Sequence, residues 1–315
     1  MSFLLLIIGF FLLIKGADLF VDSSASIARR FNVPAMVIGL TIVAMGTSAP
    51  EAAVSITSSL AGQNDMSVAN VVGSNLFNIL IVLGVSAILA KLPVEKNSIK
   101  KDTPFLLFVS SLLLLFTIDL NISRIEGIVL LIVFVYFLIN TIKGAKNTTT
   151  NSADQSEVAM EIEVSEDVSI LKTILLSILG ILGIVLGGDM VVNSATNIAT
   201  SFGMSANLVG LTIVAVGTSL PEFVTSIVAI KKGETEIAIG NVIGSNIFNI
   251  LLVLGLATTI KPISISMFAL IDIIFMVIIT ILLYLFMKKD NCLIKKQGIL
   301  FVIIYITYMS YTIIR

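Results

Sequence analysis

Long apolar runs alternate with short polar stretches along almost the whole chain. Each run holds roughly 17 to 25 predominantly apolar residues, the length that an α-helix needs to cross a bilayer. We therefore predict an all-α integral membrane protein with ten transmembrane helices, over residues 3–28, 34–60, 66–90, 103–119, 125–142, 170–199, 205–230, 236–260, 263–287 and 297–314.

One polar segment is much longer than the others. Residues 147–169 carry six acidic residues and separate the fifth apolar run from the sixth. This position divides the chain into a first five-helix repeat, residues 1–146, and a second, residues 170–315. We interpret the segment as a flexible linker. A regulatory cation-binding role is the alternative, although its acidic residues are sparse and form no ordered motif.

Two polar motifs inside the apolar runs occur twice, 171 residues apart. Residues 39–51 (GLTIVAMGTSAPE) match residues 210–222 (GLTIVAVGTSLPE) at eleven of thirteen positions, and residues 70–78 (NVVGSNLFN) return as residues 241–249 (NVIGSNIFN). Each copy of the first motif places a glutamate at membrane depth, where ionisable residues are costly and usually mark an ion or proton site. The duplication indicates two repeats around a central cation site.

Lysine and arginine residues collect on one side of the predicted helices. With the N-terminus outside, the inner loops receive fifteen of them and the outer side only three, Arg124, Lys261 and Arg315. Because cytoplasmic loops carry an excess of Lys and Arg, we expect both termini outside and the linker in the cytoplasm. Five helices per half is an odd number, so the second repeat enters the membrane inverted relative to the first, the architecture that permits alternating access.

The composition agrees with the helix pattern and excludes several kinds of functional site. The mean hydropathy is +1.09, 57% of the residues are hydrophobic, and 12% are charged, whereas about a quarter of a typical soluble domain is charged. The net charge of −1 indicates no nucleic-acid partner. With Cys292 as the only cysteine and no histidine, internal disulfides and metal sites built from Cys or His are excluded. No obligate protein partner is evident.

The first motif concentrates oxygen atoms where a helix must be interrupted. A proline inside a helix lacks an amide donor and clashes with the carbonyl four residues earlier, so Pro50 predicts a break around residues 44–47. Carbonyls freed in this way are tolerated in a membrane only inside protein or beside a wet cavity. Thr47 and Ser48 add hydroxyls, and Glu51 lies one turn beyond Thr47. The equivalent cluster contains Ala215, Thr218, Ser219 and Glu222.

All-oxygen clusters with carboxylates suit hard cations such as Ca²⁺ and Na⁺ rather than soft transition metals. The alternative is a pair of proline-kinked helices whose Thr and Ser side chains bond back to the chain. A buried glutamate at the same place in both copies favours the cation site.

The second motif supplies further polar side chains on one helix face. Ser74 and Asn78 are four residues apart, as are Ser245 and Asn249, and residues at this spacing share a face. We predict that these four coordinate cations. Asn75 and Asn246 point elsewhere, toward backbone at helix contacts, and the glycines serve close helix packing.

Asp18 and Asp189 also correspond at the 171-residue offset. They either line the ion's approach or lie near a membrane interface, and we place neither in the site. Lys15, one turn before Asp18, is a plausible ion-pair partner for it.

At these motifs the chain resembles the cation/Ca²⁺ exchanger superfamily, in particular the prokaryotic sodium/calcium exchangers. The resemblance extends over the whole chain through the ten-helix pattern and the central hydrophilic loop. It implies a 5+5 inverted repeat, broken helices 2 and 7, four ion sites between helices 2, 3, 7 and 8, and helices 1 and 6 as a sliding pair. The ligands that it implies are the carbonyls of Ala44 and Ala215 with Thr47, Ser48, Glu51, Ser74, Asn78, Thr218, Ser219, Glu222, Ser245 and Asn249.

The chain departs from some relatives in two respects. Potassium-dependent members and some close relatives carry aspartate at the position of Asn249, so the case for potassium co-transport is weakened. The linker is also too short for the regulatory Ca²⁺-binding domains of animal members.

We expect an antiporter of the plasma membrane that exchanges Na⁺ for Ca²⁺ without a cofactor, with the bilayer as its surroundings. One Ca²⁺ neutralises two ionised glutamates, and so do two Na⁺, whereas the empty site is costly to occlude. The family's three-to-one stoichiometry would make exchange electrogenic. Ca²⁺/H⁺ antiport through Glu51 and Glu222 is the main alternative, and other divalent cations remain open as substrates. A channel is disfavoured by the inverted halves, and an enzyme by the lack of a nucleophile–base pair.

Overall fold

The computed structural model describes residues 2–61, 64–153, 169–204 and 215–314. In the first half the helices, with π-helical segments written η, are α1 (Ser2–Arg30), α2 (Ala35–Ile38), η1 (Gly39–Val43), α3 (Ala44–Thr47), α4 (Ala49–Leu60), α5 (Asn64–Phe77), η2 (Asn78–Leu83), α6 (Gly84–Leu89), η3 (Ser98–Asp102), α7 (Thr103–Phe116) and α8 (Arg124–Ala153). The second half contains α9 (Ile170–Ser201), α11 (Ala215–Gly217), α12 (Leu220–Lys231), α13 (Thr235–Phe248), η5 (Asn249–Leu254), α14 (Gly255–Ile260), α15 (Met267–Asp290) and α16 (Lys295–Ile314).

Apolar runs of this length favour helices, because lipid offers no hydrogen-bond partners to the backbone. A helix pairs its N–H and C=O groups within one segment. Two of the turns contain a glycine in the left-handed conformation. Gly203 (φ 87°) comes just after α9, and Gly233 (φ 81°) lies between α12 and α13. Glycine is favoured there because it has no Cβ to clash. The predicted all-α class is confirmed.

Seven helices in the described part of the chain are long and apolar enough to cross a membrane, and an eighth is added if Ala35–Thr47 and Ala49–Leu60 form one bent span. The ten predicted spans are therefore recovered only in part. Helix α7 falls short because it ends at Phe116 and starts after the π-helical η3. Residues 205–214, which begin the predicted seventh span, lie outside the described residues, and α12 continues that span.

Several boundaries differ from the predicted ones. Helix α8 runs past residue 142 to Ala153, into the segment predicted as linker, whose residues 154–168 lie outside the described part. The ninth predicted span begins at residue 263, but Ile263–Ser264 forms a strand, and α15 starts at Met267. The backbone of Ile263–Ser264 pairs with residues 121–122 instead of joining the helix, and the apolar pattern did not predict this strand.

The two halves repeat each other's element boundaries at the 171-residue offset. Helices α4 and α12, α5 and α13, η2 and η5, and α6 and α14 each start and end at equivalent positions. The short strands obey the same rule. Strand β1 (Leu92–Pro93) pairs antiparallel with β4 (Cys292–Leu293), and β2 (Asn121–Ile122) pairs with β3 (Ile263–Ser264), so each pairing joins one half to the other.

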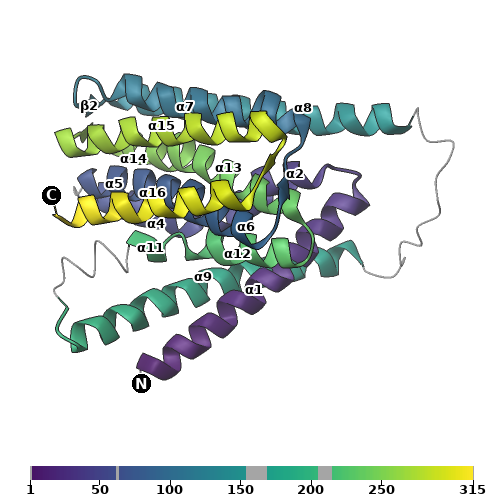
Figure 1. Ribbon diagram of the computed structural model, residues 1–315, viewed down its shortest axis with the longest axis horizontal. Coiled ribbons are helices and arrows are strands. Elements are labelled where there is room, and N and C mark those ends of the chain that lie inside the picture. Colours follow the sequence, from purple (N-terminus) through teal and green to yellow (C-terminus); the bar gives the residue numbers. More distant parts are fainter. Residues whose placement is uncertain (1, 62–63, 154–168, 205–214, 315) are drawn as a thin grey trace.

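The helices lie roughly along the long axis of the molecule (Figure 1). Helices α1 and α9 are in extensive contact and lie along one side, while α7, α8 and α15 lie on the opposite side. Both termini are at one end of the long axis, and α8 ends and α9 begins at the other end (Figure 1).

The most deeply buried segments are α5–η2 and α13–η5, which carry the second motif. Every residue of α13 from Ile237 to Phe248 is buried. The outer helices instead expose large apolar side chains, among them Ile7, Phe11, Leu175, Leu179, Ile303 and Ile306. An exposed apolar surface of this extent is a lipid-facing surface rather than one in contact with water.

Candidate functional site

Each copy of the first motif interrupts a helix just before its glutamate. Helix α3 ends at Thr47, Ser48 has non-helical angles (φ −81°, ψ 6°), and α4 begins with Pro50 in its first turn. The helical segments Ala35–Thr47 and Ala49–Leu60 are inclined to each other by 48°. Ser219 (φ −92°, ψ 6°) precedes α12 in the same way. Proline suits the first turn of a helix because the amide that it lacks has no intrahelical acceptor there.

The position of the break corrects one detail of the sequence interpretation. The chain stays helical through residues 44–47, and the Ser48 amide donates to the carbonyl of Ala44 at 3.0 Å. Thr47 Oγ1 also lies 3.3 Å from that carbonyl. The prediction that the Ala44 carbonyl is freed is therefore wrong. The second half differs, since Ser219 N donates to Val216 O at 3.2 Å. The side chain of Ala215, at the start of α11, lies outside what the structure describes.

The two glutamates are fully buried, and each is held by the serine of the other half. Ser48 Oγ donates to Glu222 Oε1 at 3.0 Å, and Ser219 Oγ donates to Glu51 Oε1 at 3.2 Å. Glu222 Oε1 also accepts from Ser245 Oγ at 3.4 Å. The second oxygen of each carboxylate, Oε2, is buried with no hydrogen-bond partner among the described residues.

The crossed serine bonds bring the two glutamates into one buried region, where like charges repel each other. Burying one ionised carboxylate without a compensating charge is costly, and a second like charge adds to that cost. The side-chain hydrogen bonds that these carboxylates accept come from serine hydroxyls, and none of the ion pairs among the described residues involves either glutamate. The site therefore has the electrostatics of a receptor for cations.

Two asparagines that sequence reasoning assigned no role hold the first motif in place. Asn70 Nδ2 donates to the Glu51 carbonyl at 3.2 Å and to Ser55 Oγ at 3.0 Å. Asn241 repeats both bonds with Glu222 and Ser226, at 3.3 and 3.0 Å.

The oxygen of each of these amides accepts a threonine hydroxyl from the other half. Thr47 Oγ1 donates to Asn241 Oδ1 at 3.0 Å, and Thr218 Oγ1 donates to Asn70 Oδ1 at 3.4 Å. Thr47 Oγ1 also lies 3.4 Å from Ser245 Oγ. Both asparagines open a repeated motif inside an apolar helix, and this repetition was the feature that could have identified them.

The second motif brings its predicted residues to the same buried region. Ser245 Oγ donates to Glu222 Oε1 at 3.4 Å, while Ser74 Oγ is buried and has no hydrogen-bond partner among the described residues. Asn78 and Asn249 each begin a π-helical segment, η2 and η5, and π-helical turns are frequent at functional sites. Their Oδ1 atoms are buried and have no hydrogen-bond partner among the described residues.

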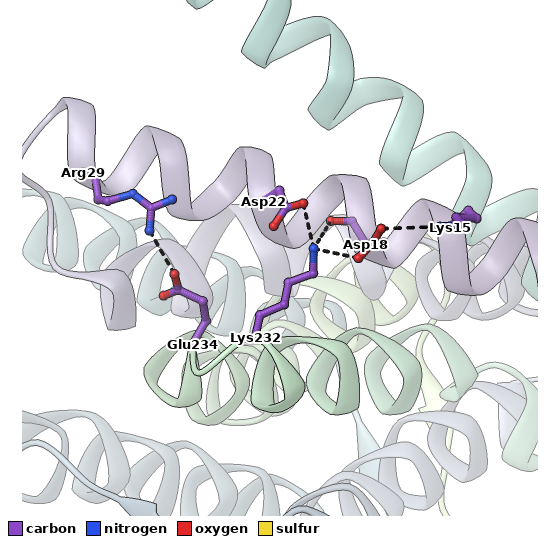
Figure 2. Close-up of polar contacts among 6 residues, drawn as sticks. All are labelled: Lys15, Asp18, Asp22, Arg29, Lys232 and Glu234. Atoms are coloured by element: carbon purple, nitrogen blue, oxygen red, sulfur yellow. Dashed lines mark hydrogen bonds and ion pairs between the residues drawn. The ribbon is translucent and has the colours of Figure 1, made fainter. Parts of the chain in front are cut away.

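Asp18 does not belong to this cluster. Its side chain is 39% exposed and pairs with Lys15 at 3.8 Å, as predicted, and with Lys232 at 2.6 Å, which was not predicted. Figure 2 shows Lys232 reaching from the end of α12 to both Asp18 and Asp22 on α1. Partial burial works against it, but these hydrogen bonds raise the pKa of Lys232.

A second ion pair on the same side joins Arg29 to Glu234 at 3.0 Å (Figure 2). These pairs fasten α1 to the turn between α12 and α13. The equivalents of Lys232 and Arg29 at the 171-residue offset are Ala61 and Thr200, so the repeat does not encode the same contact on the other half. Asp189, the counterpart of Asp18, is exposed on α9.

Comparison with known proteins places this arrangement among cation transporters. The family model described as sodium/calcium exchanger protein matches residues 1–143 and 172–314. The sodium/calcium exchanger MaX1 of Methanosarcina acetivorans is 32% identical over 98% of this chain and 97% of its own length. The putative antiporter CaxA of Alkalimonas amylolytica is 43% identical over 81% of this chain and 80% of its own length.

Similarity to a solved structure leads to the same group. The structure of the sodium-calcium exchanger NCX_Mj soaked with Na⁺ and Sr²⁺ superimposes with a TM-score of 0.85 at 35% sequence identity, covering 98% of this chain and 97% of that one. Both halves of the chain match the family model, each with its own pair of motifs. The chain is a multi-pass membrane protein and belongs to the sodium/calcium exchanger protein family.

Proposed function

We propose that this protein is a secondary active antiporter that exchanges Na⁺ for Ca²⁺. The observation that carries the proposal is the pair of fully buried glutamates, Glu51 and Glu222, each with one oxygen that has no hydrogen-bond partner among the described residues. The family membership and the named exchangers among its relatives support the same activity. The protein thus acts as a transporter rather than as an enzyme.

The charge of the site explains why the two ions exchange rather than leak. Two ionised glutamates make the empty site strongly negative, and occluding it in a low-dielectric core is costly. One Ca²⁺ or two Na⁺ cancel that charge, and a third Na⁺ leaves one positive charge. A loaded carrier therefore reorients more readily than an empty one. Exchange of three Na⁺ for one Ca²⁺ moves net charge and is electrogenic.

Oxygen atoms from both halves form the proposed cation site. Ca²⁺ takes six to eight oxygen ligands in flexible geometry, and the cluster offers carboxylates, hydroxyls and amides for this purpose. The proposed ligands are the side chains of Thr47, Ser48, Glu51, Ser74, Asn78, Thr218, Ser219, Glu222, Ser245 and Asn249 with the carbonyls of Ala44 and Ala215. The Ala44 carbonyl already accepts the Ser48 amide, and Thr47 Oγ1 lies 3.3 Å from it. The single hydrogen of that hydroxyl also serves Asn241 Oδ1 at 3.0 Å, so an ion at the Ala44 carbonyl competes with a shared bond.

The proposed architecture is a ten-helix inverted repeat in the plasma membrane, with residues 1–146 and 170–315 as the two halves. The equal element boundaries at the 171-residue offset support two equivalent halves. Both termini lie at one end of the molecule, opposite the ends of α8 and α9 (Figure 1). Fifteen Lys and Arg residues in the predicted inner loops, against three outside, support an orientation with the termini outside and residues 147–169 in the cytoplasm.

The inverted arrangement predicts opposite accessibility for two equivalent residues. Phe31 and Phe202 occupy the same position in the two halves, and both are exposed. In a Cys292→Ser background, a cysteine at position 31 should react with an impermeant maleimide only from the cytoplasmic side, and one at position 202 only from outside. Reaction of both cysteines from the same side would contradict an inverted repeat.

A transport assay tests the exchange itself. Purified protein in proteoliposomes loaded with Na⁺ should take up radioactive Ca²⁺ when diluted into Na⁺-free medium, and valinomycin with K⁺ should clamp the membrane potential. A pH gradient imposed without Na⁺ should drive no uptake. Uptake that follows the pH gradient and ignores Na⁺ would establish Ca²⁺/H⁺ antiport instead.

Variants of Ser74 and Ser245 distinguish Na⁺ coupling from proton coupling. Their hydroxyls can coordinate Na⁺, but they do not exchange protons near neutral pH. Replacing either with alanine removes one neutral ligand and leaves both glutamates in place. We expect the Na⁺ concentration for half-maximal Ca²⁺ movement to rise about 10-fold, the effect of one lost interaction of roughly 1.4 kcal/mol.

The control for the serine variants is Ser110→Ala, a buried serine of α7 outside the proposed site. It should leave the Na⁺ dependence unchanged. If Ser74→Ala and Ser245→Ala shift the Ca²⁺ dependence but not the Na⁺ dependence, neither hydroxyl is a Na⁺ ligand.

A further inference from the structure

Asn75 and Asn246 form a reciprocal contact between the two halves. Both side chains are buried. Asn75 Nδ2 donates to the backbone carbonyl of Asn246 at 3.2 Å, and Asn246 Nδ2 donates to the backbone carbonyl of Asn75 at 3.3 Å. Asn75 Nδ2 also lies 3.7 Å from Met276 Sδ. This agrees with the expectation that these asparagines bond backbone at helix contacts.

These backbone bonds fix which way each amide faces. A carbonyl oxygen can only accept, so the NH₂ group of each amide must point to the opposite backbone, and its oxygen must point away. Asn75 Oδ1 then accepts from Asn249 Nδ2 at 3.2 Å, and Asn246 Oδ1 accepts from Asn78 Nδ2 at 3.1 Å. The orientation of Asn75 and Asn246 therefore determines that of two proposed cation ligands.

The remaining oxygens of those ligands are left free for an ion. With their NH₂ groups engaged, Asn78 and Asn249 retain Oδ1 atoms that are buried and have no hydrogen-bond partner among the described residues. An amide in the reverse orientation would present its partly positive NH₂ group to the cation. Both amide oxygens are instead held available to coordinate a cation.

We propose that Asn75 and Asn246 are positioning residues, which hold the carboxamides of Asn249 and Asn78 with their oxygens toward the transported cation. The proposal rests on the proposed function, since it requires Asn78 and Asn249 to be ion ligands. Each positioning residue acts on the ligand of the other half. Cation affinity at one half thus depends on packing between the two second motifs, in addition to the ligands themselves.

The geometry allows the two positioning residues, Asn75 and Asn246, to be tested separately. Asn75→Ala removes the acceptor of Asn249 Nδ2 but keeps the Asn75 backbone carbonyl, which anchors Asn246. Only Asn249 should be released. By the same argument, Asn246→Ala should release only Asn78. The two pairs, Asn75 with Asn249 and Asn246 with Asn78, form independent double-mutant cycles.

The experiment measures the KM for Ca²⁺ in Na⁺-loaded proteoliposomes, with thermal stability recorded for every variant. Asn75→Ala and Asn249→Ala should each raise the KM about 10-fold. The double variant Asn75→Ala/Asn249→Ala should be no worse than Asn249→Ala, because the residue through which Asn75 acts is gone. Asn78→Ala should also raise the KM about 10-fold, so the matched control Asn75→Ala/Asn78→Ala should raise it about 100-fold, because those two effects are independent.

The other possible results would contradict either the positioning role of Asn75 or the proposed ion site. Multiplying effects in the Asn75/Asn249 pair would mean that Asn75 only supports the fold, and would overturn the positioning role. An unchanged KM in Asn75→Ala alongside a raised KM in Asn249→Ala would overturn it as well. An unchanged KM in Asn249→Ala would remove Asn249 from the proposed ion site, which is a failure of that site. If Asn75→Ala does not fold, the Asn246/Asn78 cycle provides the same test.

Discussion

Replacing Glu51 or Glu222 with glutamine is expected to reduce Ca²⁺ exchange at least about 100-fold while the protein remains folded. Glutamine has nearly the same volume and keeps an oxygen that can accept the bond from Ser219 or Ser48, at 3.2 and 3.0 Å in the native protein. The change removes one of the two negative charges that balance Ca²⁺. One close charge pair is worth about 4 kcal/mol at an effective dielectric of about 20, more than the roughly 2.7 kcal/mol that a 100-fold change represents.

The measurement is Na⁺-driven Ca²⁺ uptake per amount of reconstituted protein, with size-exclusion chromatography as the check on folding. Asp290→Asn is the matched control, because it also removes one carboxylate, at the exposed end of α15. Its uptake should equal that of the wild type. Uptake like that of the wild type in either glutamine variant would remove that glutamate from the cation site.

The candidate site could be predicted largely because its motifs occur twice in the sequence. Both halves carry a glutamate, two hydroxyls and a proline at equivalent positions. Such repetition is improbable unless these residues have a common function. The structure brings together Ser48, Glu51, Ser219 and Glu222 as predicted. Ser74, Asn78, Ser245 and Asn249 lie in the same buried region. Repetition and the cost of charge in a membrane were enough for this inference.

The pairing between halves could not be obtained in the same way. Spacing within one helix shows which side chains share a face, but not which face of another helix they meet. The bond from Ser48 to Glu222 joins residues 174 positions apart, and the bond from Asn78 to Asn246 joins residues 168 positions apart. The first contact depends on how closely α12 approaches α3, and the second on how closely α13 approaches η2, and local sequence patterns do not encode those distances.

Local backbone geometry was the other gap. The sequence predicted a break over residues 44–47, whereas α3 stays helical through Thr47 and the break falls at Ser48, because Pro50 fits the first turn of the next helix. The π-helical segments beginning at Asn78 and Asn249 were not predicted. A single extra residue in a helical turn leaves no apolar periodicity long enough to detect. The Lys232 ion pairs were missed because no motif links α1 to the end of α12.

Gly187→Ala is expected to destabilise the protein strongly, although alanine is the better helix former. Helices α1 and α9 cross at very close range, and a Cβ at Gly187 would lie 2.5 Å from Leu13 N and 2.8 Å from Gly9 O. Both atoms belong to the backbone of α1, so neither can move aside as a flexible side chain could. Close approach of this kind is the usual role of small residues between membrane helices. The cost of overpacking should be about 1–3 kcal/mol.

The adjacent residue provides a matched control for this prediction. A Cβ at Gly188 would meet Pro221 Cγ at 3.5 Å, an ordinary contact, so Gly188→Ala should leave stability unchanged or raise it by up to about 1 kcal/mol through helix propensity. Thermal unfolding in detergent, followed by loss of the monodisperse chromatographic peak, compares the two variants directly. Gly187→Ala should lose its peak at a clearly lower temperature than both the wild type and Gly188→Ala. Equal midpoints for the two alanine variants would show that α1 can separate from α9 at little cost, and the tight crossing would then not be a source of stability.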